Sequence, residues 1–342
     1  MSAIRGILRR LADGHDLTRE EASAAMGEVV EGRATPVQIG AFLVALRMKG
    51  ETVDEIVGCA EAIRSRALRV RCDDPRALDT CGTGGDGAGT FNVSTAVAFV
   101  AAACGATVAK HGNHGVSSAC GSADVLEASG FDLGAPTARV ERSLAEHRVA
   151  FLYAPAYHPA VRHAAAPRRE IGVRTVFNAI GPMANPAGVK RQVLGIYDGR
   201  LLEPVARALG ELGSEHVLVV HGLDGLDEIS CAAPTDVAEW REGTLRRFTI
   251  APEDAGVSRY PQDAIRGGPP RENARLLREV LAGAAPEAFV EVVALNTAAA
   301  LVVAGLAADL RDGAARSRRA MRDGSAVETF RRAAAESRGE RP

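Results

Sequence analysis

Aromatic residues are scarce in this sequence, which has one Trp, four Tyr and nine Phe among 342 residues. So few rings do not suit a surface on which nucleic-acid bases stack. The 41 basic residues nearly balance the 43 acidic ones, so the net charge of −2 gives no general attraction to nucleic acid or to an anionic membrane. The composition excludes a DNA-coating protein. Hydrophobic residues make up 46% of the sequence, which excludes a disordered chain.

Cysteine pairs of the C-x-x-C type are also missing, which removes the usual signal for a zinc site or a redox motif. The six cysteines are scattered along the chain: Cys59, Cys72, Cys81, Cys104, Cys120 and Cys231. Most have apolar or glycine-rich neighbours, so we expect reduced, buried thiols and a cytoplasmic location. The first ten residues have no apolar run followed by a small-residue cleavage site, and we therefore predict no secretion signal.

One long segment, Gly87 to Ala109, carries no formal charge and is long enough to cross a membrane. It contains Asn92, Ser94 and Thr95 and begins as a glycine-rich loop. We therefore predict that it forms a buried helix of the core, and that the protein has no membrane partner.

The first seventy residues have the signals of an all-helical domain. Three capping boxes pair Thr18 with Glu21, Thr35 with Gln38, and Thr52 with Glu55. Pro36 occupies the first helical position of the second box, and the glycines at 32 and 50 follow the preceding helices. This spacing predicts three helices of roughly 14 to 16 residues in a domain spanning 1–70.

From residue 72 to 342 short apolar strands alternate with helices, which predicts an α/β domain with a mainly parallel central sheet flanked by helices. Strands are expected at 78–80, 106–109, 149–153 and 216–221, and a helix at 94–105. Residues 238–250 resemble a hairpin at the sheet edge. A helical insertion near 160–190 is expected to join the helical domain, and a final helix with a frayed tail is expected after Ser317.

A glycine-rich segment, Gly82–Gly87, is expected to follow a strand and precede a helix. It contains the G-x-G-x-x-G pattern of dinucleotide-binding proteins, which also needs an acidic residue about 20 positions further on. The next acidic residue is Asp124, which is too far away. Bare backbone N–H groups, followed by hydroxyl side chains at a helix N-terminus, favour phosphate instead. A purely structural turn is the alternative for the glycine cluster taken alone.

A second polar segment, Lys110–Ser118, reads Lys-His-Gly-Asn-His-Gly-Val-Ser-Ser and is followed by Gly-Ser-Ala-Asp at 121–124. A lysine at a strand end, followed by glycine, asparagine and hydroxyl side chains, is typical of a site that holds a polyanion. For His111 and His114 the alternative is an ordinary hydrogen-bonded loop histidine.

A third segment, His221–Glu228, also follows an apolar strand. Its adjacent acids, Asp227 and Glu228, repel each other unless they are solvated or share a cation. Oxygen ligands in a glycine-rich loop suit Mg²⁺, which also binds substrate phosphates. A solvated acidic loop is the alternative. Together, the three segments predict a pocket for a phosphorylated small molecule with magnesium.

In combination, these motifs make the sequence similar to the anthranilate phosphoribosyltransferase family, from Leu11 to about residue 312. The matching strings are Gly82–Asp86, Asn92–Thr95, Lys110–Asn113, Gly121–Glu127, Arg174–Asn178, Gly181–Pro182, Asn185–Pro186 and Asp224–Ser230. The resemblance implies transfer of a phosphoribosyl group from phosphoribosyl pyrophosphate to the amine of anthranilate, with release of pyrophosphate. It also implies a homodimer formed through the helical domain.

The resemblance further implies a set of site residues. The residues expected to bind phosphoribosyl pyrophosphate are Gly82, Gly85, Asp86, Thr90, Asn92, Val93, Ser94, Thr95, Lys110, His111, Gly112, Asn113, His114, Gly115, Val116, Ser117, Ser118 and Ser122. Those expected to bind anthranilate are Gly82, Asn113 and Arg168. Ser94, Asp227 and Glu228 are expected to bind magnesium, and Lys110, His111 and Asn113 are the candidate catalytic residues.

This chemistry needs no covalent nucleophile. Magnesium and Lys110 would neutralise the departing pyrophosphate, while Asn113 and Arg168 hold the attacking amine in line. A guanidinium suits the carboxylate of the acceptor because it pairs with it through two parallel hydrogen bonds. One residue departs from the family: the motif usually reads Lys-His-Gly-Asn-Arg, whereas this sequence has His114 at the last position. We expect activity to survive this loss of a permanent charge.

Two alternatives belong to different classes. The first is an enzyme of the same fold with another acceptor, either a related aromatic amine or, with phosphate replacing pyrophosphate, a pyrimidine nucleoside. Retention of Asp227, Glu228 and Arg168 argues against the nucleoside phosphorylase. The second is a non-catalytic relative that binds nucleic acid, which the net charge of −2 disfavours.

Overall fold

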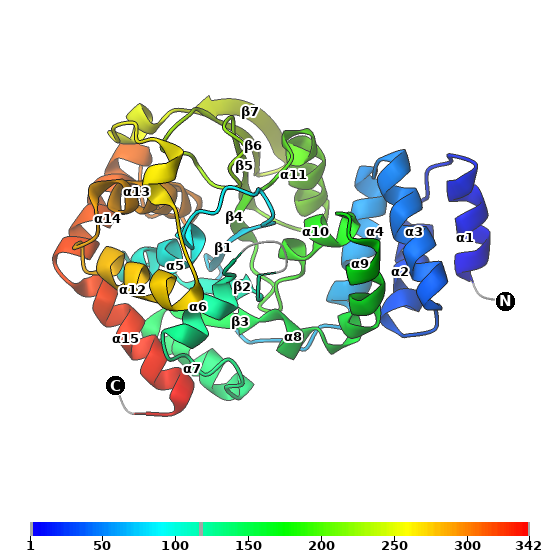
Figure 1. Ribbon diagram of the computed structural model, residues 1–342, viewed down its shortest axis with the longest axis horizontal. Coiled ribbons are helices and arrows are strands. Elements are labelled where there is room, and N and C mark those ends of the chain that lie inside the picture. Colours follow the sequence, from blue (N-terminus) through cyan, green and yellow to red (C-terminus); the bar gives the residue numbers. More distant parts are fainter. Residues whose placement is uncertain (1–2, 116–118, 341–342) are drawn as a thin grey trace.

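The structure is a computed structural model in which residues 3–115 and 119–340 are described. Within them, a seven-stranded sheet runs through the broad end of the molecule (Figure 1). Its strands are β1 (Leu78–Gly82), β2 (Val108–Gly112), β3 (Val149–Tyr153), β4 (Arg191–Gly195), β5 (His216–Gly222), β6 (Thr235–Arg241) and β7 (Thr244–Ile250). The spatial order is β3-β2-β1-β4-β5-β6-β7. The first five are parallel, and β6 and β7 form an antiparallel hairpin at one edge, so the predicted fold class is confirmed.

Four helices make up the narrow end (Figure 1). They are α1 (Ala3–Ala12), α2 (Arg19–Val30), α3 (Pro36–Lys49) and α4 (Val53–Arg64). All three predicted capping boxes are present at the starts of α2, α3 and α4. Helices α2 and α4 are 12 residues long, shorter than predicted, because Glu31 and Ser65 already end them. Helix α1 was not predicted; it forms because Ile4, Ile7 and Leu11 are buried along one face.

Each face of the sheet packs against its own hydrophobic core. The remaining helices are α5 (Val93–Ala103), α6 (Ser122–Ala128), α7 (Thr137–His147), α8 (Ala154–Tyr157), α9 (Ala165–Ile171), α10 (Val176–Ile180), α11 (Leu202–Glu211), α12 (Pro270–Leu281), α13 (Glu287–Val303), α14 (Leu310–Arg322) and α15 (Ser325–Arg338). Helices α5 and α12–α15 share one hydrophobic core, whereas α1–α4, α10 and α11 share the other. Neighbouring residues of one strand point to different cores: Val193 belongs to the first and Leu194 to the second.

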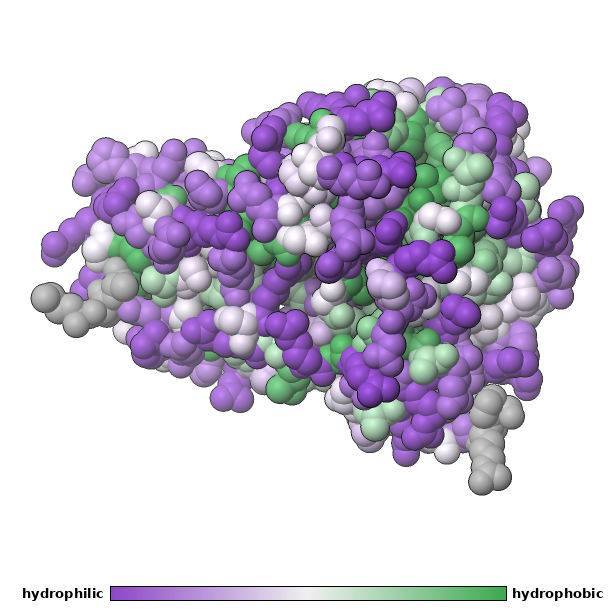
Figure 2. All heavy atoms as spheres, turned by 180° about the vertical axis from the view of Figure 1, so that it is seen from behind, coloured by the Kyte–Doolittle hydropathy of each residue, from purple (hydrophilic) through white to green (hydrophobic). Residues whose placement is uncertain are grey.

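The uncharged segment from 87 to 109 contains α5, whose residues are mostly buried in the first core, as predicted. In the described part of the chain no helix has both the length and the apolar character needed to cross a bilayer. Figure 2, which shows the molecule from behind, has hydrophilic residues spread over both ends of that face and apolar patches between them.

The C-terminal helix α15 is firmly packed rather than frayed. The ring of Phe330 lies 4.9 Å from that of Phe99 and 5.3 Å from that of Phe131, measured between ring centroids. The inner side of this helix is apolar, and most of its charged residues lie on the outer side, although Glu336 is buried. The expected final helix is therefore present up to Arg338, and the last two residues of the expected tail lie outside the described residues.

The 3-10 helix η1 (Pro159–Ala164) and the helices α9 and α10 pack against the narrow end. They contact α2, α3 and α4 respectively, and Figure 1 shows α9 and α10 beside these helices. The assignment of residues near 160–190 to the helical domain as an insertion stays a prediction. The division of the chain into domains at 1–70 and 72–342 stays a prediction.

Candidate active site

The polar segments singled out in the sequence meet at one edge of the sheet. Strands β1, β2, β4 and β5 are parallel and end at Gly82, Gly112, Gly195 and Gly222. Ligands of open parallel sheets bind at this carboxyl edge. Each of the three segments begins in the last residues of one of these strands and continues beyond it, so the pairing of the strands brings the segments to the same edge.

Asp227 lies against the ends of β1 and β4. Its Oδ2 accepts a 2.6 Å hydrogen bond from the N–H of Gly84, and its own N–H donates to Oδ2 of Asp86 at 3.4 Å. Gly82 and Gly195 are paired in register. A Cβ atom on Gly195 would lie 1.6 Å from the Asp227 carbonyl oxygen, and one on Gly82 would lie 2.6 Å from Oδ2. These two glycines therefore leave the space that Asp227 occupies.

Lys110, Ser94 and Glu228 form a connected group beside Asp227. The Ser94 N–H donates to Oε1 of Glu228 at 3.0 Å, and Nζ of Lys110 donates to Oγ of Ser94 at 3.2 Å. Nζ also donates to the carbonyl oxygen of Thr80. Lys110 is only 3% exposed, and this burial lowers the pKa of its ammonium group. The structure thus brings three predicted site residues together, with Lys110 beneath the surface of the site.

The acidic groups of the site carry more negative charge than their surroundings balance. Burial, followed by the nearby Asp86 and Glu228, raises the pKa of Asp227 well above its usual value. Burial also raises the pKa of Glu228 to about 7, although Lys110 and the Ser94 N–H oppose this shift. A divalent cation would relieve the repulsion, and carboxylate and hydroxyl oxygens are ligands that Mg²⁺ prefers. The residues present fit the expected magnesium site.

The loop between β1 and α5 is held by protein contacts at both ends. Gly84, Gly85, Gly87 and Gly89 all have positive φ angles, which glycine adopts without strain. Thr90 pairs with Arg266 in an isolated bridge. Asn92 donates from Nδ2 to the carbonyl oxygen of Cys120 at 3.0 Å and accepts from Nδ2 of Asn273 at the same distance. Asn92 therefore organises the loop in addition to its expected role in donor binding.

Val93 and Thr95, which follow Asn92 at the start of α5, are both buried. The hydroxyl of Thr95 has no hydrogen-bond partner among the described residues. Gly85 and Asp86 lie in the same loop, where Oδ1 of Asp86 accepts from the N–H of Ala88 at 3.2 Å. This part of the predicted donor site is thus preformed by backbone geometry.

The segment after β2 forms a second cluster. The carbonyl oxygen of Asn113 accepts from Oγ of Ser122 at 3.3 Å and from the N–H of Ala123 at 3.1 Å. His114 hydrogen-bonds to Asp124, which also accepts from Gly115. Val116, Ser117 and Ser118 lie outside the described residues.

A buried polar cluster next to His111 was missed by the sequence analysis. Asp79 accepts from the His111 N–H at 3.1 Å and from Nδ2 of Asn185 at 2.9 Å. The His111 ring lies 5.1 Å from that of His158, centroid to centroid. Burial raises the pKa of Asp79 to about 6 and, with the positive groups nearby, lowers that of His111 to about 3. An acidic residue inside the apolar strand at 78–82 was the available signal for this cluster.

Arg168 lies on α9, far along the chain from the strand ends of the sheet. Its guanidinium carbon stacks 4.7 Å above the ring of Phe177. Burial lowers its pKa, and it makes no ion pair within the described ranges. A half-buried guanidinium without an acidic partner is suited to receive a carboxylate ligand. No direct contact joins Arg168 to Gly82 or Asn113 among the described residues.

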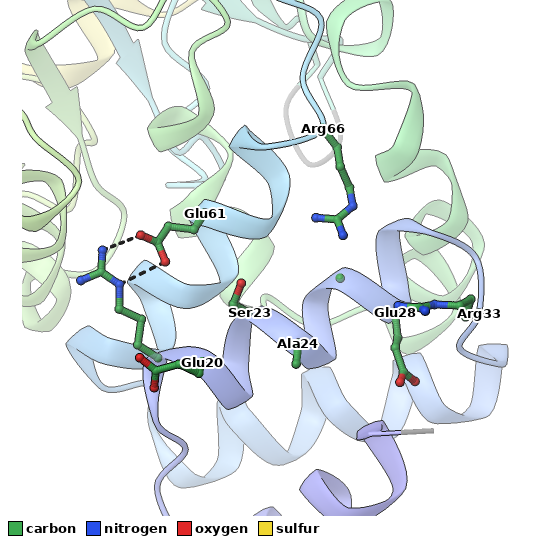
Figure 3. A pocket seen from close by; sticks show the side chains of 9 residues that line it. Glu20, Ser23, Ala24, Glu28, Arg33, Glu61 and Arg66 are labelled. Carbon is green, nitrogen blue, oxygen red and sulfur yellow. Dashed lines mark hydrogen bonds and ion pairs between the residues drawn. The ribbon is translucent and has the colours of Figure 1, made fainter. Parts of the chain in front are cut away.

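Two other features lie away from this edge. A pocket of about 690 Å³ on α2 is lined by Arg19, Glu20, Ser23, Ala24, Gly27, Glu28, Arg33, Glu61 and Arg66 (Figure 3). Its acidic and basic side chains balance, and Arg19 already pairs with Glu61 at 2.5 Å. A group of possible metal ligands, Glu146, His147 and Glu336, lies on α7 and α15, where Arg142 pairs with Glu336 at 3.4 Å. Neither feature contains a predicted site residue.

Comparison with known families matches two segments of the chain. Residues 74–327 match the α/β domain of a glycosyl transferase family, and residues 5–67 match its helical bundle domain. The anthranilate phosphoribosyltransferase of Myxococcus xanthus is 54% identical over 327 residues, which cover 94% of this chain and 96% of the relative.

Solved structures give the same result. The anthranilate phosphoribosyltransferase of Thermus thermophilus superposes with a TM-score of 0.92 at 41% identity, covering 99% of this chain and 100% of that one. The Saccharomyces cerevisiae enzyme in complex with phosphoribosyl pyrophosphate and Mg has a TM-score of 0.89 at 26% identity, with 98% of both chains covered. The same yeast enzyme in complex with 4-fluoroanthranilate has a TM-score of 0.88 at 25% identity, again over 98% of both chains.

Proposed function

Because the chain belongs to the anthranilate phosphoribosyltransferase family, we propose that it transfers the 5-phosphoribosyl group from phosphoribosyl pyrophosphate to the amine of anthranilate. The products are the phosphoribosylated amine and pyrophosphate, and the reaction serves tryptophan biosynthesis. The observation that carries the proposal is the group of Ser94, Lys110, Asp227 and Glu228 at one sheet edge. Arg168, which has no acidic partner in the described part of the chain, supports it.

Magnesium is held, in this proposal, by Ser94, Asp227 and Glu228. When bound, it compensates the charge of the donor's pyrophosphate and makes that group a better leaving group. The loop from Gly82 to Asp86 and the start of α5 supply N–H and hydroxyl groups to the phosphates. Lys110 supports the magnesium ligands from beneath the site. Its Nζ donates to Oγ of Ser94 at 3.2 Å, and its positive charge stabilises the ionised form of Glu228.

Anthranilate is assigned to the region between Asn113, Gly82 and Arg168. The acceptor carboxylate would pair with the guanidinium of Arg168, which Phe177 holds in place. His111 and Asn113 lie at the end of β2, next to the donor cluster. His111 is neutral at pH 7 because its pKa is about 3, so it can orient neighbouring groups without adding charge to the site. Displacement at the anomeric carbon then depends on positioning and on charge stabilisation.

A homodimer formed through the narrow end is part of the proposal. Val37, Ala41, Val44 and Met48 follow one another along a single face of α3. Val37 is 80% and Met48 is 83% exposed, although both are large and apolar. A stripe of this kind is typical of a surface that another chain covers.

The cysteines of the described chain are all free, which supports a reducing, cytoplasmic location.

The direct test is a steady-state assay that follows the loss of anthranilate fluorescence in the presence of phosphoribosyl pyrophosphate and Mg²⁺. We expect turnover that stops when a chelator removes the metal. Absence of turnover with anthranilate, together with turnover of a related aromatic amine or of a pyrimidine nucleoside and phosphate, would favour a same-fold enzyme with another acceptor. Tight binding of an oligonucleotide at physiological salt would favour the nucleic-acid-binding alternative.

A further inference from the structure

Asp124 connects both ends of the segment that follows β2. It is the third residue of α6, and its Oδ2 accepts from the N–H of Gly121 at 2.7 Å and from the N–H of Gly115 at 2.8 Å. Its Oδ1 lies 2.6 Å from Nδ1 of His114. Both carboxylate oxygens are therefore engaged by groups of the protein.

The His114 ring must donate in this contact. Burial alone would raise the pKa of Asp124, but the two backbone N–H groups and His114 outweigh it and lower the pKa, so Asp124 is ionised at neutral pH. An ionised carboxylate only accepts hydrogen bonds, which assigns the proton to Nδ1. The His114 ring also packs against the ring of Tyr153, whose centroid lies 5.3 Å away at an interplanar angle of 82°.

The surrounding backbone leaves little freedom for this arrangement. A Cβ atom on Gly121 would lie 2.2 Å from the Gly115 nitrogen and 2.5 Å from the His114 carbonyl carbon. The segments on the two sides of residues 116–118 are thus in direct contact at Gly121. Gly121 follows Cys120, whose carbonyl oxygen accepts from Nδ2 of Asn92 at 3.0 Å. Asp124 is therefore linked through the backbone to the start of α5, where the donor phosphates are assigned.

We propose that His114 is a positioning residue that acts through Asp124, and not a ligand of the donor phosphates. The inference rests on the proposed function and changes the role expected for this residue. The hydrogen bond from His114 holds the Asp124 carboxylate in place. Asp124 in turn accepts from the N–H groups of Gly115 and Gly121, and this fixes the backbone that positions Asn113. The same contact shields the negative charge of Asp124 from a donor that carries several negative charges of its own. Histidine is shorter than the arginine usual at this position, but it is long enough for this role because its partner, Asp124, belongs to the protein itself.

A double-mutant cycle tests this mechanism. We expect His114→Ala to raise the KM for phosphoribosyl pyrophosphate about fivefold, with kcat changed less than twofold. His114→Asn should restore a KM within twofold of wild type, because its amide N–H occupies nearly the place of Nδ1. Asp124→Asn should raise the KM at least as much as His114→Ala, and the double variant no further than Asp124→Asn alone. His15→Ala, at an exposed histidine of the narrow end, is the control and should leave KM unchanged.

Multiplying effects in the double variant, or failure of His114→Asn to restore the KM, would overturn the proposal, since either result means that His114 contacts the donor directly. Amide hydrogen exchange on the ligand-free protein tests the same arrangement without activity. We expect slow exchange at Gly115 and Gly121 in wild type and at least tenfold faster exchange in Asp124→Asn, with α15 unchanged as a measure of folding. Equal exchange in the two proteins would contradict it. Lack of wild-type turnover would reject the proposed function alone.

Discussion

Among single residues, Arg168 has the most direct consequence for substrate selection. It is half-buried, stacked on Phe177 and without an ion pair in the described part of the chain. A buried guanidinium that lacks a partner is costly, and a ligand carboxylate would remove that cost. Its neighbour Arg169 is exposed on the same helix and provides a matched comparison.

Replacing Arg168 by Ala should raise the KM for anthranilate by roughly 10- to 100-fold, the range expected for a hydrogen-bonded charge pair of about 1.5–3 kcal/mol. Arg168→Lys should recover only part of this loss, because lysine cannot pair with both carboxylate oxygens in one plane. Steady-state kinetics with saturating donor measures the effect. Equal KM values for Arg168→Ala and Arg169→Ala would contradict the assignment.

His111 makes a prediction about stability and pH. Burial, with His158 and Lys110 nearby, lowers its pKa from 6.5 to about 3 in the folded protein. Between pH 6.5 and pH 3, His111 therefore binds a proton in the unfolded chain but not in the folded one. Its contribution to the free energy of unfolding is fully present above pH 6.5 and is lost as the pH drops toward 3. Between pH 7 and pH 5 wild type should lose about 2 kcal/mol more unfolding free energy than His111→Asn.

Urea unfolding at the two pH values measures this difference. His15→Asn, at an exposed histidine, should follow wild type. A wild type and a His111→Asn protein that lose the same free energy between pH 7 and pH 5 would show that His111 titrates normally.

At the scale of elements, the ends of β1 and β4 determine where the loop that contains Asp227, the proposed magnesium ligand, can lie. Gly82 was predicted as a substrate-binding residue, and the structure shows that it also leaves space for Asp227. Gly195 was not predicted, because its importance depends on a loop more than thirty residues further along the chain. The two glycines are neighbours only because the sheet pairs β1 with β4.

Gly195→Ala should displace Asp227, since the new Cβ would lie 1.6 Å from its carbonyl oxygen. We expect the Mg²⁺ concentration needed for half-maximal activity to rise at least tenfold, measured by titrating the metal at fixed substrate. Gly6→Ala in α1 is the control, because a Cβ atom there meets nothing within 4 Å. An unchanged Mg²⁺ requirement in Gly195→Ala would show that the loop adapts to the added methyl group.

Helices with strong local signals were predicted well, and those formed by packing were not. The capping boxes of α2, α3 and α4 are satisfied within four residues, so the sequence contains all the partners. Helix α1 has no such box and depends on contacts with α2 and α3. The charged sequence of α15 concealed a stripe of apolar residues that the first core covers, including Phe330.

For the whole molecule, the exposed stripe on α3 predicts the state of association. Met48→Glu places a charge within the apolar stripe and should convert the proposed dimer to a monomer with the chain mass of 35.7 kDa. Light scattering at micromolar concentration measures this mass. Phe248→Glu, at a 39% exposed aromatic residue of β7, should keep the mass of wild type. A monomeric wild type would contradict the proposal that the narrow end forms an interface.

The sequence by itself determined the mainly parallel α/β sheet, three capped helices and the polar segments of the site, because periodicity, caps and motifs are local properties. Only the tertiary structure decided that Nζ of Lys110 contacts Oγ of Ser94, that Gly195 leaves space for Asp227, and that Asp124 hydrogen-bonds to His114. Each of these depends on which strands are neighbours and on how deeply a charged group is buried. Those properties come from packing distant segments together, and no local pattern contains them.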